Sequence, residues 1–434
     1  MMQRRGFIKK AALATAGAFA APYILPSGRL FAATGSRIAN HVVLCLFAGG
    51  VRNFESMQKA EGNLMPFTLT GNESINPQII GGMDALPTPS GQRLQQQGTL
   101  YKEFRFAQGP TGHFSGHSTA LTGQYVLGDL NIKQRPTYPT VFEYYRKHNS
   151  PSMSALNAWW VANTLGPYPA LNFSQYPGYG AEFGANFIQP GSIISIPGYN
   201  SLGDPKNFEA VQLDKVKSLR QFMDNNFSIN YTPGDAGITN IEEEAILIEN
   251  YINNSFDEAV AGQYDNPWGV GNSMNGDMYN VFFAEQIIKQ FKPELTVVNM
   301  QDIDVCHTNF TGYCNNIRKS DYALAHLWQT IQSTPGMAND TILIAVPEHG
   351  RNEQPNTILD AYGKYALDHN SDEVSRQIFC LIVGPPDKVV QNQVISTVTG
   401  ESIDVVPTIA KVLGFQNDIP GGMLSGTSLD QAFI

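Results

Sequence analysis

Short, continuous apolar runs alternate with longer segments of helical periodicity along most of the chain. A run without polar interruption, such as HVVLCLF at His41 to Phe47, is typical of a strand buried on both faces. Strands that alternate with helices favour an α/β fold, in which helices sandwich a mostly parallel sheet. We predict strands at 41–47, 101–107, 153–158, 295–300, 341–346 and 378–383, and helices at 115–122, 139–148, 208–226, 241–260, 278–291, 313–333 and 405–413.

Between about residues 159 and 272 this alternation loosens, and Tyr, Gly, Pro and Asn accumulate before two further helical stretches. With 42% hydrophobic and 15% charged residues, the chain can bury a large core. We therefore predict a single domain over residues 34–434, with an inserted cap at about 159–272. Its first part, Trp159 to Asn200, is where we expect a substrate lid or a partner surface.

The N-terminus has the layout of a twin-arginine export signal. Arg4 and Arg5 precede an apolar run from Ala11 to Ala21, which is too short to anchor the chain stably in a bilayer. We expect residues 1–33 to be removed, after Ala20 or Ala33, and the product to be periplasmic or exported, with no stable membrane span. An N-terminal membrane or amphipathic helix is the alternative interpretation.

The net charge of the chain limits the classes of molecule that it can bind. The formal net charge of −10, with no basic run outside the signal, argues against a nucleic-acid or anionic-membrane partner.

Cys45 and Cys380 lie in apolar runs and are interpreted as small buried hydrophobic residues. Cys306 and Cys314 are close enough in sequence to form a disulfide in an oxidising compartment. Metal ligation by Cys306 is the weaker alternative, because no second Cys stands at a zinc-type spacing.

Candidate metal ligands follow the predicted strand ends. Glu348 and His349 come directly after the run at 341–346, which breaks at Pro347, and a carboxylate beside an imidazole suggests a divalent metal ion. Ligands in such sheets collect outside the carboxyl ends of the strands. Five of the 8 histidines lie in segments expected there, His113, His117, His307, His349 and His369, and they are accompanied by Asp302, Asp304 and Asp368.

Each of these segments also has a structural interpretation. A single His at a strand end is commonly a hydrogen-bonded loop residue, and Asp302 and Asp304 fit the cap of the following turn. Ser115 fits an N-cap as well as it fits a nucleophile. The helix start that contains His113 favours negative charge. Taken jointly, the imidazole and carboxylate groups favour zinc, manganese or iron over calcium.

In this order the segments resemble the alkaline-phosphatase-like superfamily, which includes sulfatases, nucleotide pyrophosphatases and metal-dependent phosphoglycerate mutases. The likeness is closest to a poorly characterised branch that is exported by the twin-arginine route. It covers both ends of the mature chain and implies an alkaline-phosphatase-like fold. The residues that carry it are Gly49-Gly50, the Glu348-His349-Gly350-Arg351 loop, Asp368-His369 and the run Asp404 to Thr408.

The resemblance implies two metal ions around a nucleophile at a helix start. The ligands of the first ion would be His307, His369 and one Asp of the Asp302/Asp304 pair. The superfamily spacing places that Asp four positions before the His, which is Ile303 here, so one neighbouring Asp must reach the ion by a shifted loop.

For the second ion, Glu348 and His349 match the expected acidic residue and His. Its remaining ligand, an Asp after the first strand, falls on Gly49 and is absent. The nucleophile position falls on His113 and the position four residues later on His117, which disfavours sulfatase chemistry. The resemblance leaves His113 as a ligand, a base or a phospho-accepting nucleophile.

Three hypotheses follow. The first is an exported metal-dependent hydrolase of phosphoric or related esters with an altered active site, acting on a small-molecule or polymer ester. The second is a catalytically degenerate member that binds a protein partner in an envelope complex. The third is another hydrolase or a lyase that uses His113 and His117 as acid and base beside one metal ion. The expected cofactor is one or two divalent ions (zinc, manganese or iron), or none.

Overall fold

The computed structural model describes residues 35–57, 62–71, 79, 81–128, 135–149, 154–162, 171–190, 241–270, 274–370 and 372–434. The expected export signal at 1–33 and the expected helix at 208–226 lie outside these residues, as does much of the expected cap. Among the described helices, none is both long enough and apolar enough to cross a membrane.

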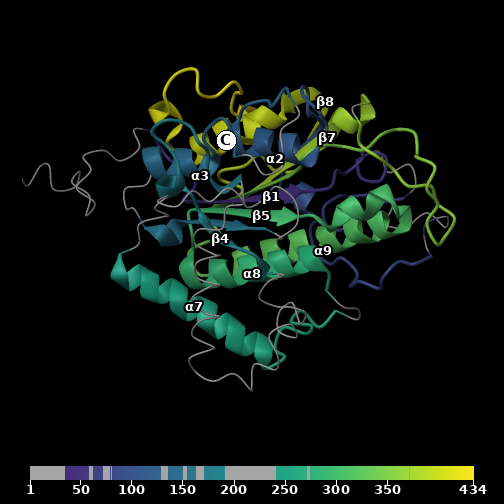
Figure 1. Ribbon diagram of the computed structural model, residues 1–434, viewed down its shortest axis with the longest axis horizontal. Helices are drawn as coiled ribbons and strands as arrows, with labels where there is room; N and C mark the ends of the chain where they lie inside the picture. Colours follow the sequence, from purple (N-terminus) through teal and green to yellow (C-terminus); the bar gives the residue numbers. More distant parts are fainter. Residues whose placement is uncertain are drawn as a thin grey trace, which may run out of the picture.

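In the described part of the chain, eight strands form one sheet in the order β4-β3-β5-β1-β6-β7-β2-β8 (Figure 1). Every neighbouring pair is parallel except β6–β7 and β7–β2, so β7 alone is reversed. The prediction of a mostly parallel α/β sheet is therefore confirmed. The strands are β1 (His41–Phe47), β2 (Gly98–Arg105), β3 (Ala158–Val161), β4 (Asn186–Ile188), β5 (Leu295–Met300), β6 (Thr341–Pro347), β7 (Gln377–Val383) and β8 (Gln393–Glu401).

Helices cover both faces of the sheet. Figure 1 shows α2 and α3 on one side of the strands and α7, α8 and α9 on the other. Residues of β1 alternate between the two layers: Val43 and Cys45 belong to the core under α8 and α9, and Val42 and Leu44 to the core under α2 and α10. Burying each such side chain contributes roughly 1.5–3 kcal/mol. The bounds are α2 (His113–Thr122), α3 (Val141–Tyr144), α7 (Glu242–Val260), α8 (Gly276–Phe291), α9 (Phe310–Ser333) and α10 (Val405–Val412).

The sequence pattern did not find β4 or β8. β4 has only three residues, and β8 is an edge strand whose side chains are mostly exposed or half-buried, so neither produces a continuous apolar run. The strand predicted at 153–158 is wrong in position, because a 3₁₀ turn at Ala155–Asn157 precedes β3. The helix predicted at 139–148 is split, since α3 gives way to a π-helical turn at Tyr145–Asn149. The expected cap region begins with β3 and β4, which belong to the main sheet.

The reversal of β7 decides what reaches the edge of the sheet. Its register pairs Leu343 with Val383 and Ala345 with Leu381, so β7 starts where β6 ends. The segment before β7, which contains Asp368 and His369, therefore arrives at the carboxyl ends of β1, β5 and β6. Residues from four separate chain segments can meet there.

The four cysteines are buried and unbridged. Cys45 lies in β1 and Cys380 in β7, which confirms that they act as small apolar residues of the core. The disulfide considered between Cys306 and Cys314 is not formed. Burial raises the pKa of the Cys306 thiol to about 12, so this group stays protonated at neutral pH and does not offer a thiolate ligand.

Glu143 anchors the start of α3 to the loop before β4. Its carboxylate accepts hydrogen bonds from Thr140 N at 2.6 Å, Ser174 N at 3.0 Å, Ser174 Oγ at 2.9 Å and Gly180 N at 2.8 Å. Burial raises the pKa of Glu143 from its ordinary 4.5 to about 7, and outweighs the opposing effect of these hydrogen bonds. The folded chain therefore binds this proton more tightly than the unfolded chain does.

Glu143→Gln is expected to flatten the pH dependence of stability. The contribution of Glu143 is fully present below its unfolded pKa of 4.5 and is lost as the pH rises to about 7. The loss amounts to at most about 1.4 kcal/mol per pH unit for one proton. Urea unfolding across this pH range measures the slope, and the exposed Glu353→Gln serves as control. Equal slopes in Glu143→Gln and the parent protein would contradict the expectation.

Candidate metal centre

His113 and His117 lie one turn apart on α2 and share a face of the helix. This face packs tightly against the end of β6: a Cβ atom on Gly116 would lie 2.8 Å from Glu348 O. Glycine at this position therefore lets the helix approach Glu348. Ser115 is buried on α2 and, two residues from His113, does not share its face.

A 3₁₀ turn after β5, η9 (Asp302–His307), carries the second pair of polar side chains. Asp304 and His307 are three residues apart, and residues at this spacing eclipse one another in a 3₁₀ helix, so both project toward the edge of the sheet. Asp302 faces elsewhere. Its Oδ2 accepts the Gly276 N–H at 2.7 Å at the start of α8, and its own N–H donates to Asp277 Oδ1 at 2.9 Å.

Three histidines each form a hydrogen bond through Nδ1, on the side of the ring that faces away from the cluster. His113 Nδ1 lies 2.7 Å from Glu348 Oε1, and His307 Nδ1 lies 2.7 Å from Asp368 Oδ1. His369 Nδ1 donates to the carbonyl oxygen of Thr111. Because each partner only accepts, a proton belongs on Nδ1 of each ring, and the lone pair of the neutral ring lies on Nε2. Metal-binding histidines are held in this way, which fixes their tautomer and orientation.

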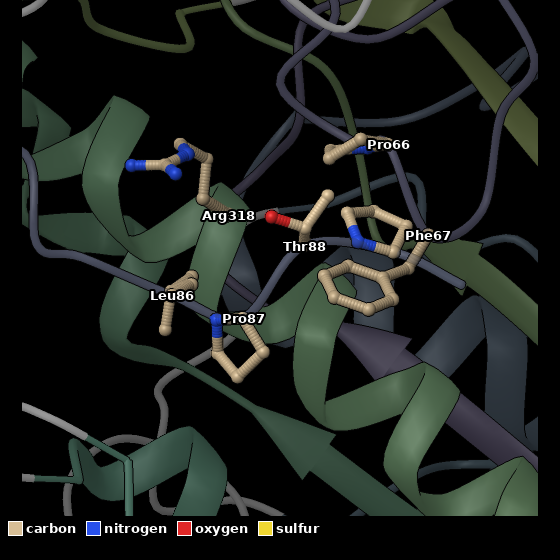
Figure 2. Close-up of a pocket in the computed structure, with 7 residues that line it drawn as sticks. Pro66, Phe67, Leu86, Pro87, Thr88 and Arg318 are labelled. Carbon is tan, nitrogen blue, oxygen red and sulfur yellow. The ribbon is translucent and has the colours of Figure 1, made fainter.

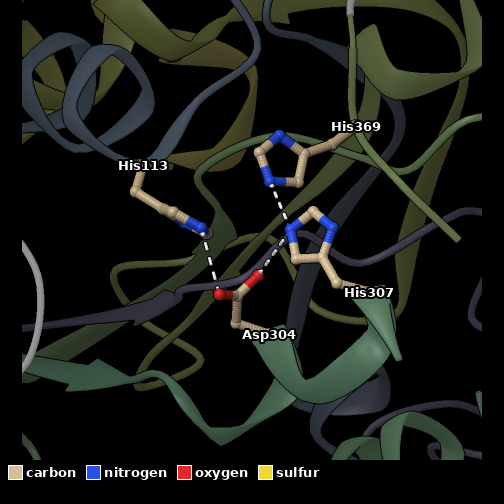
Figure 3. Close-up of side chains that lie close together, drawn as sticks. All are labelled: His113, Asp304, His307 and His369. Carbon is tan, nitrogen blue, oxygen red and sulfur yellow. Dashed lines mark hydrogen bonds and ion pairs between the residues drawn. The ribbon is translucent and has the colours of Figure 1, made fainter. Parts of the chain in front are cut away.

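The Nε2 atoms of these histidines converge around the Asp304 carboxylate (Figure 3). His113 Nε2 lies 3.2 Å from Asp304 Oδ2, and His307 Nε2 lies 3.3 Å from Asp304 Oδ1. His307 Nε2 and His369 Nε2 face each other at 3.0 Å. Two lone pairs at this distance repel unless a proton or a cation lies between them. The donor set of three imidazoles and one carboxylate fits zinc or another divalent transition metal.

Charges around the cluster set the protonation states. Burial raises the pKa of the Asp304 carboxyl, but the polar contacts with His113 and His307 and the charges of His113 and Arg351 outweigh it and hold the pKa well below its usual range. Burial and the charges of His349, Arg351 and His113 lower the pKa of His369 to about 2. The carboxylate is therefore ionised and His369 neutral, which are the forms that bind a metal.

His113 carries an extra proton in the metal-free protein. Burial lowers its pKa, but the charge of Glu348 and hydrogen bonds to Asp304 and Glu348 outweigh burial and raise the pKa to about 10. A metal at His113 Nε2 would displace that proton.

Glu348 and His349, the pair of ligands that the sequence indicated first, lie deeper in the protein than His113, Asp304 and His307. Both side chains are 0% exposed, whereas those of His113, Asp304 and His307 are 26%, 34% and 37% exposed. Glu348 Oε1 also accepts the Gly49 N–H at 2.5 Å, and Glu348 Oε2 is in ion-pair contact with His117 Nδ1. Together with His113 the pair forms a second group of potential ligands.

The remaining predicted residues stand behind these groups. His117 is 0% exposed, with Nδ1 2.8 Å from His113 O and Nε2 2.6 Å from Asn299 Oδ1. Ser115 and Asp302 belong to neither group of potential ligands. The structure thus brings together six predicted residues, His113, Asp304, His307, Glu348, His349 and His369.

Three residues contribute to the site in ways that the sequence analysis did not predict. Asp368 orients His307, the Thr111 carbonyl orients His369, and the guanidinium of Arg351 bonds to Asp304 Oδ1 at 2.7 Å. Asp368 and Arg351 stand beside predicted ligands, and that adjacency was the available signal. A backbone carbonyl such as that of Thr111 leaves no trace in the sequence.

A separate pocket of about 200 Å³ lies against α9 and the loops at 66–67 and 86–89 (Figure 2). Figure 2 shows Arg318 reaching from α9 beside Thr88, opposite Phe67. The pocket is lined by Pro66, Phe67, Leu86, Pro87, Thr88, Pro89 and Arg318. None of these residues belongs to the histidine cluster, so the pocket is distinct from the metal centre.

Comparisons with known proteins add the family. The model of the type I phosphodiesterase / nucleotide pyrophosphatase family matches residues 76–392, well over half of the chain. The search of curated proteins finds no match.

Among solved structures, the chain is similar to a protein of the alkaline phosphatase superfamily from Vibrio parahaemolyticus, with 13% identity, coverage of 92% of this chain and 74% of that one, and a TM-score of 0.43. It is similar to the phosphonate monoester hydrolase of Agrobacterium radiobacter, with 12% identity, 90% and 76% coverage, and a TM-score of 0.45. A mutant of the alkaline phosphatase PafA gives 10% identity, 91% and 99% coverage, and a TM-score of 0.45.

The family assignment rests on the family model, which names one of the groups in the superfamily that the sequence resembles. The chain belongs to the type I phosphodiesterase / nucleotide pyrophosphatase family, hydrolases of phosphoric esters.

Proposed function

We propose that this protein is an exported hydrolase of phosphoric esters that depends on a divalent metal ion. The observation that carries the proposal is the pair of Nε2 lone pairs of His307 and His369, which face each other at 3.0 Å beside an ionised carboxylate. Nothing but a proton or a cation relieves that arrangement. The ion would be held by four side chains, His113, Asp304, His307 and His369.

Such an ion, when bound, polarises a phosphoryl oxygen and offsets the negative charge that develops during ester cleavage. The protein's own residues prepare the site for it. Glu348 and Asp368 orient the imidazoles of His113 and His307, and Arg351 holds the Asp304 carboxylate in place at 2.7 Å. The partial exposure of His113, Asp304 and His307 leaves the cluster open to a substrate.

In this proposal the attacking oxygen comes from water. His113 occupies the place where the superfamily resemblance puts a nucleophile, and it is bonded on both sides, to Glu348 and to Asp304. The nearest hydroxyl before the helix, Thr111 Oγ1, donates to His369 O at 2.7 Å. Export rests on Arg4, Arg5 and the apolar run from Ala11 to Ala21.

One observation favours a second candidate, a catalytically inert member that binds a partner. It is the same substitution, an imidazole in place of a hydroxyl at His113. The third hypothesis, acid–base chemistry by His113 and His117, loses support because His117 is 0% exposed and both of its ring nitrogens have partners within the protein.

Metal analysis and an ester panel test the proposal. Protein purified without chelator is expected to retain a divalent metal and to cleave a bis-aryl phosphodiester in preference to an aryl sulfate. A chelator should abolish cleavage, and zinc or manganese should restore it. Bound metal with no ester hydrolysed would favour the inert candidate, and protein that neither retains nor takes up metal would overturn the proposal.

A further inference from the structure

We infer that this site is built for one divalent ion, and that the buried guanidinium of Arg351 takes the place of a second. The inference rests on the metal dependence proposed above. Three features of the strand-end side of the site support it: the shortage of ligand atoms there, the close contact at Gly49 and the position of Arg351.

Oε1 of Glu348 has no lone pair to spare for an ion, because it accepts from Gly49 N at 2.5 Å and from His113 Nδ1 at 2.7 Å. Oε2 of Glu348 is in ion-pair contact with His117 Nδ1. When His113 binds an ion through Nε2, the proton on Nδ1 still needs Glu348 as its acceptor. The buried acceptors left on this side are Glu348 Oε2 and His349 Nε2, because His349 Nδ1 is committed to Gly350 O at 2.7 Å. These two donors are one short of the three protein ligands that a catalytic zinc site uses.

Gly49 cannot be replaced by a ligand without displacing η9. Its φ is +95°, and a Cβ there would lie 2.4 Å from the backbone N of Asp304. The space that a strand-end side chain would need is therefore filled by the turn that carries Asp304 and His307. A ligand at position 49 and the observed histidine–aspartate cluster exclude each other.

Arg351 supplies a positive charge on this side. Its side chain is 0% exposed, and Nη2 bonds to Asp304 Oδ1 at 2.7 Å and to the carbonyl oxygen of Gly49, while Nη1 donates to Leu367 O at 3.0 Å. These contacts fix the guanidinium against the same carboxylate that faces the cluster. A second divalent cation beside a buried guanidinium would be repelled strongly, because little water screens the two charges.

Metal counting tests the inference. Metal-free protein titrated with zinc or manganese, followed by elemental analysis after gel filtration, is expected to bind one equivalent. His349→Gln, which keeps the volume of this buried side chain, should also bind one equivalent, with an affinity within about threefold of the parent, and His307→Ala should bind none tightly. Two equivalents in the parent, falling to one in His349→Gln, would overturn the inference. No binding at all would instead overturn the proposed function.

The role of Arg351 is tested by separating rate from metal content. Arg351→Met is expected to retain one equivalent but to lower kcat by at least about tenfold, because the fixed positive charge against Asp304 is lost. Arg351→Lys should recover part of the rate, because it restores the charge. Unchanged kcat in Arg351→Met, or no recovery in a folded Arg351→Lys, would refute the role of the guanidinium as the fixed charge.

Discussion

His369→Ala is expected to weaken metal binding by at least about 100-fold, since loss of even an outer partner of a ligand costs 10- to 100-fold. Phosphodiester hydrolysis should fall to the level of the chelator-treated protein. His369 is one of the two imidazoles whose lone pairs face each other, and its Nδ1 is already fixed by Thr111. The measurements are zinc titration and the initial rate of hydrolysis at saturating metal.

The sign of the stability change separates a metal ligand from a structural histidine. In the metal-free protein, His369→Ala removes a repulsion between Nε2 atoms, so thermal stability should be unchanged or higher. With metal present, the parent gains stability and the variant does not. His41→Ala is the control, because His41 starts β1 at the opposite end of the strand and contacts Pro293 O. Equal destabilisation of His369→Ala with and without metal would mean that His369 is structural.

Gly49→Ala is expected to destabilise the protein by roughly 2–5 kcal/mol. The backbone conformation at φ +95° costs about 1–2 kcal/mol for an L-residue, and overpacking against Asp304 N adds about 1–3 kcal/mol. The displaced η9 turn should also weaken metal binding, because it carries Asp304 and His307. Urea unfolding of the metal-free protein and zinc titration measure the two effects.

Gly336→Ala provides a matched control for that substitution. Gly336 has φ +90°, and a Cβ there meets no atom within 4 Å, so the backbone strain alone lowers the stability of the alanine variant. We expect a loss of about 1–2 kcal/mol and unchanged metal affinity. If Gly49→Ala costs no more than Gly336→Ala, the close contact with η9 is not a constraint on the site.

The layered fold was predictable because its central strands are buried on both faces. β1, β5, β6 and β7 each produce an apolar run that needs no knowledge of their neighbours. β8 was not predicted, because an edge strand exposes about half of its residues and its sequence pattern resembles that of a loop. The antiparallel direction of β7 could also not be predicted from the sequence, because an apolar run does not indicate the direction in which its strand runs in the sheet.

The site was predictable as a set of residues but not as an arrangement. The sequence placed His307, His369 and Asp304 at one edge, and the structure brings them together. It could not decide between Asp302 and Asp304, because that choice depends on the orientation of a 3₁₀ turn whose other carboxylate caps α8. The sequence left His113 as a ligand, a base or a nucleophile, and the geometry favours the ligand, because its Nδ1 has a partner and its Nε2 faces Asp304.

The four side chains of the cluster come from three distant parts of the chain. His307 and His369 are 62 residues apart, and His113 is 235 residues from Glu348, the residue that holds it. An ion bound here acts as a cross-link that closes long loops, and so removes conformational freedom from the unfolded chain. Because the ligands meet only after these segments have folded together, capture of the ion reports that α2, η9 and the loop before β7 have reached their native positions.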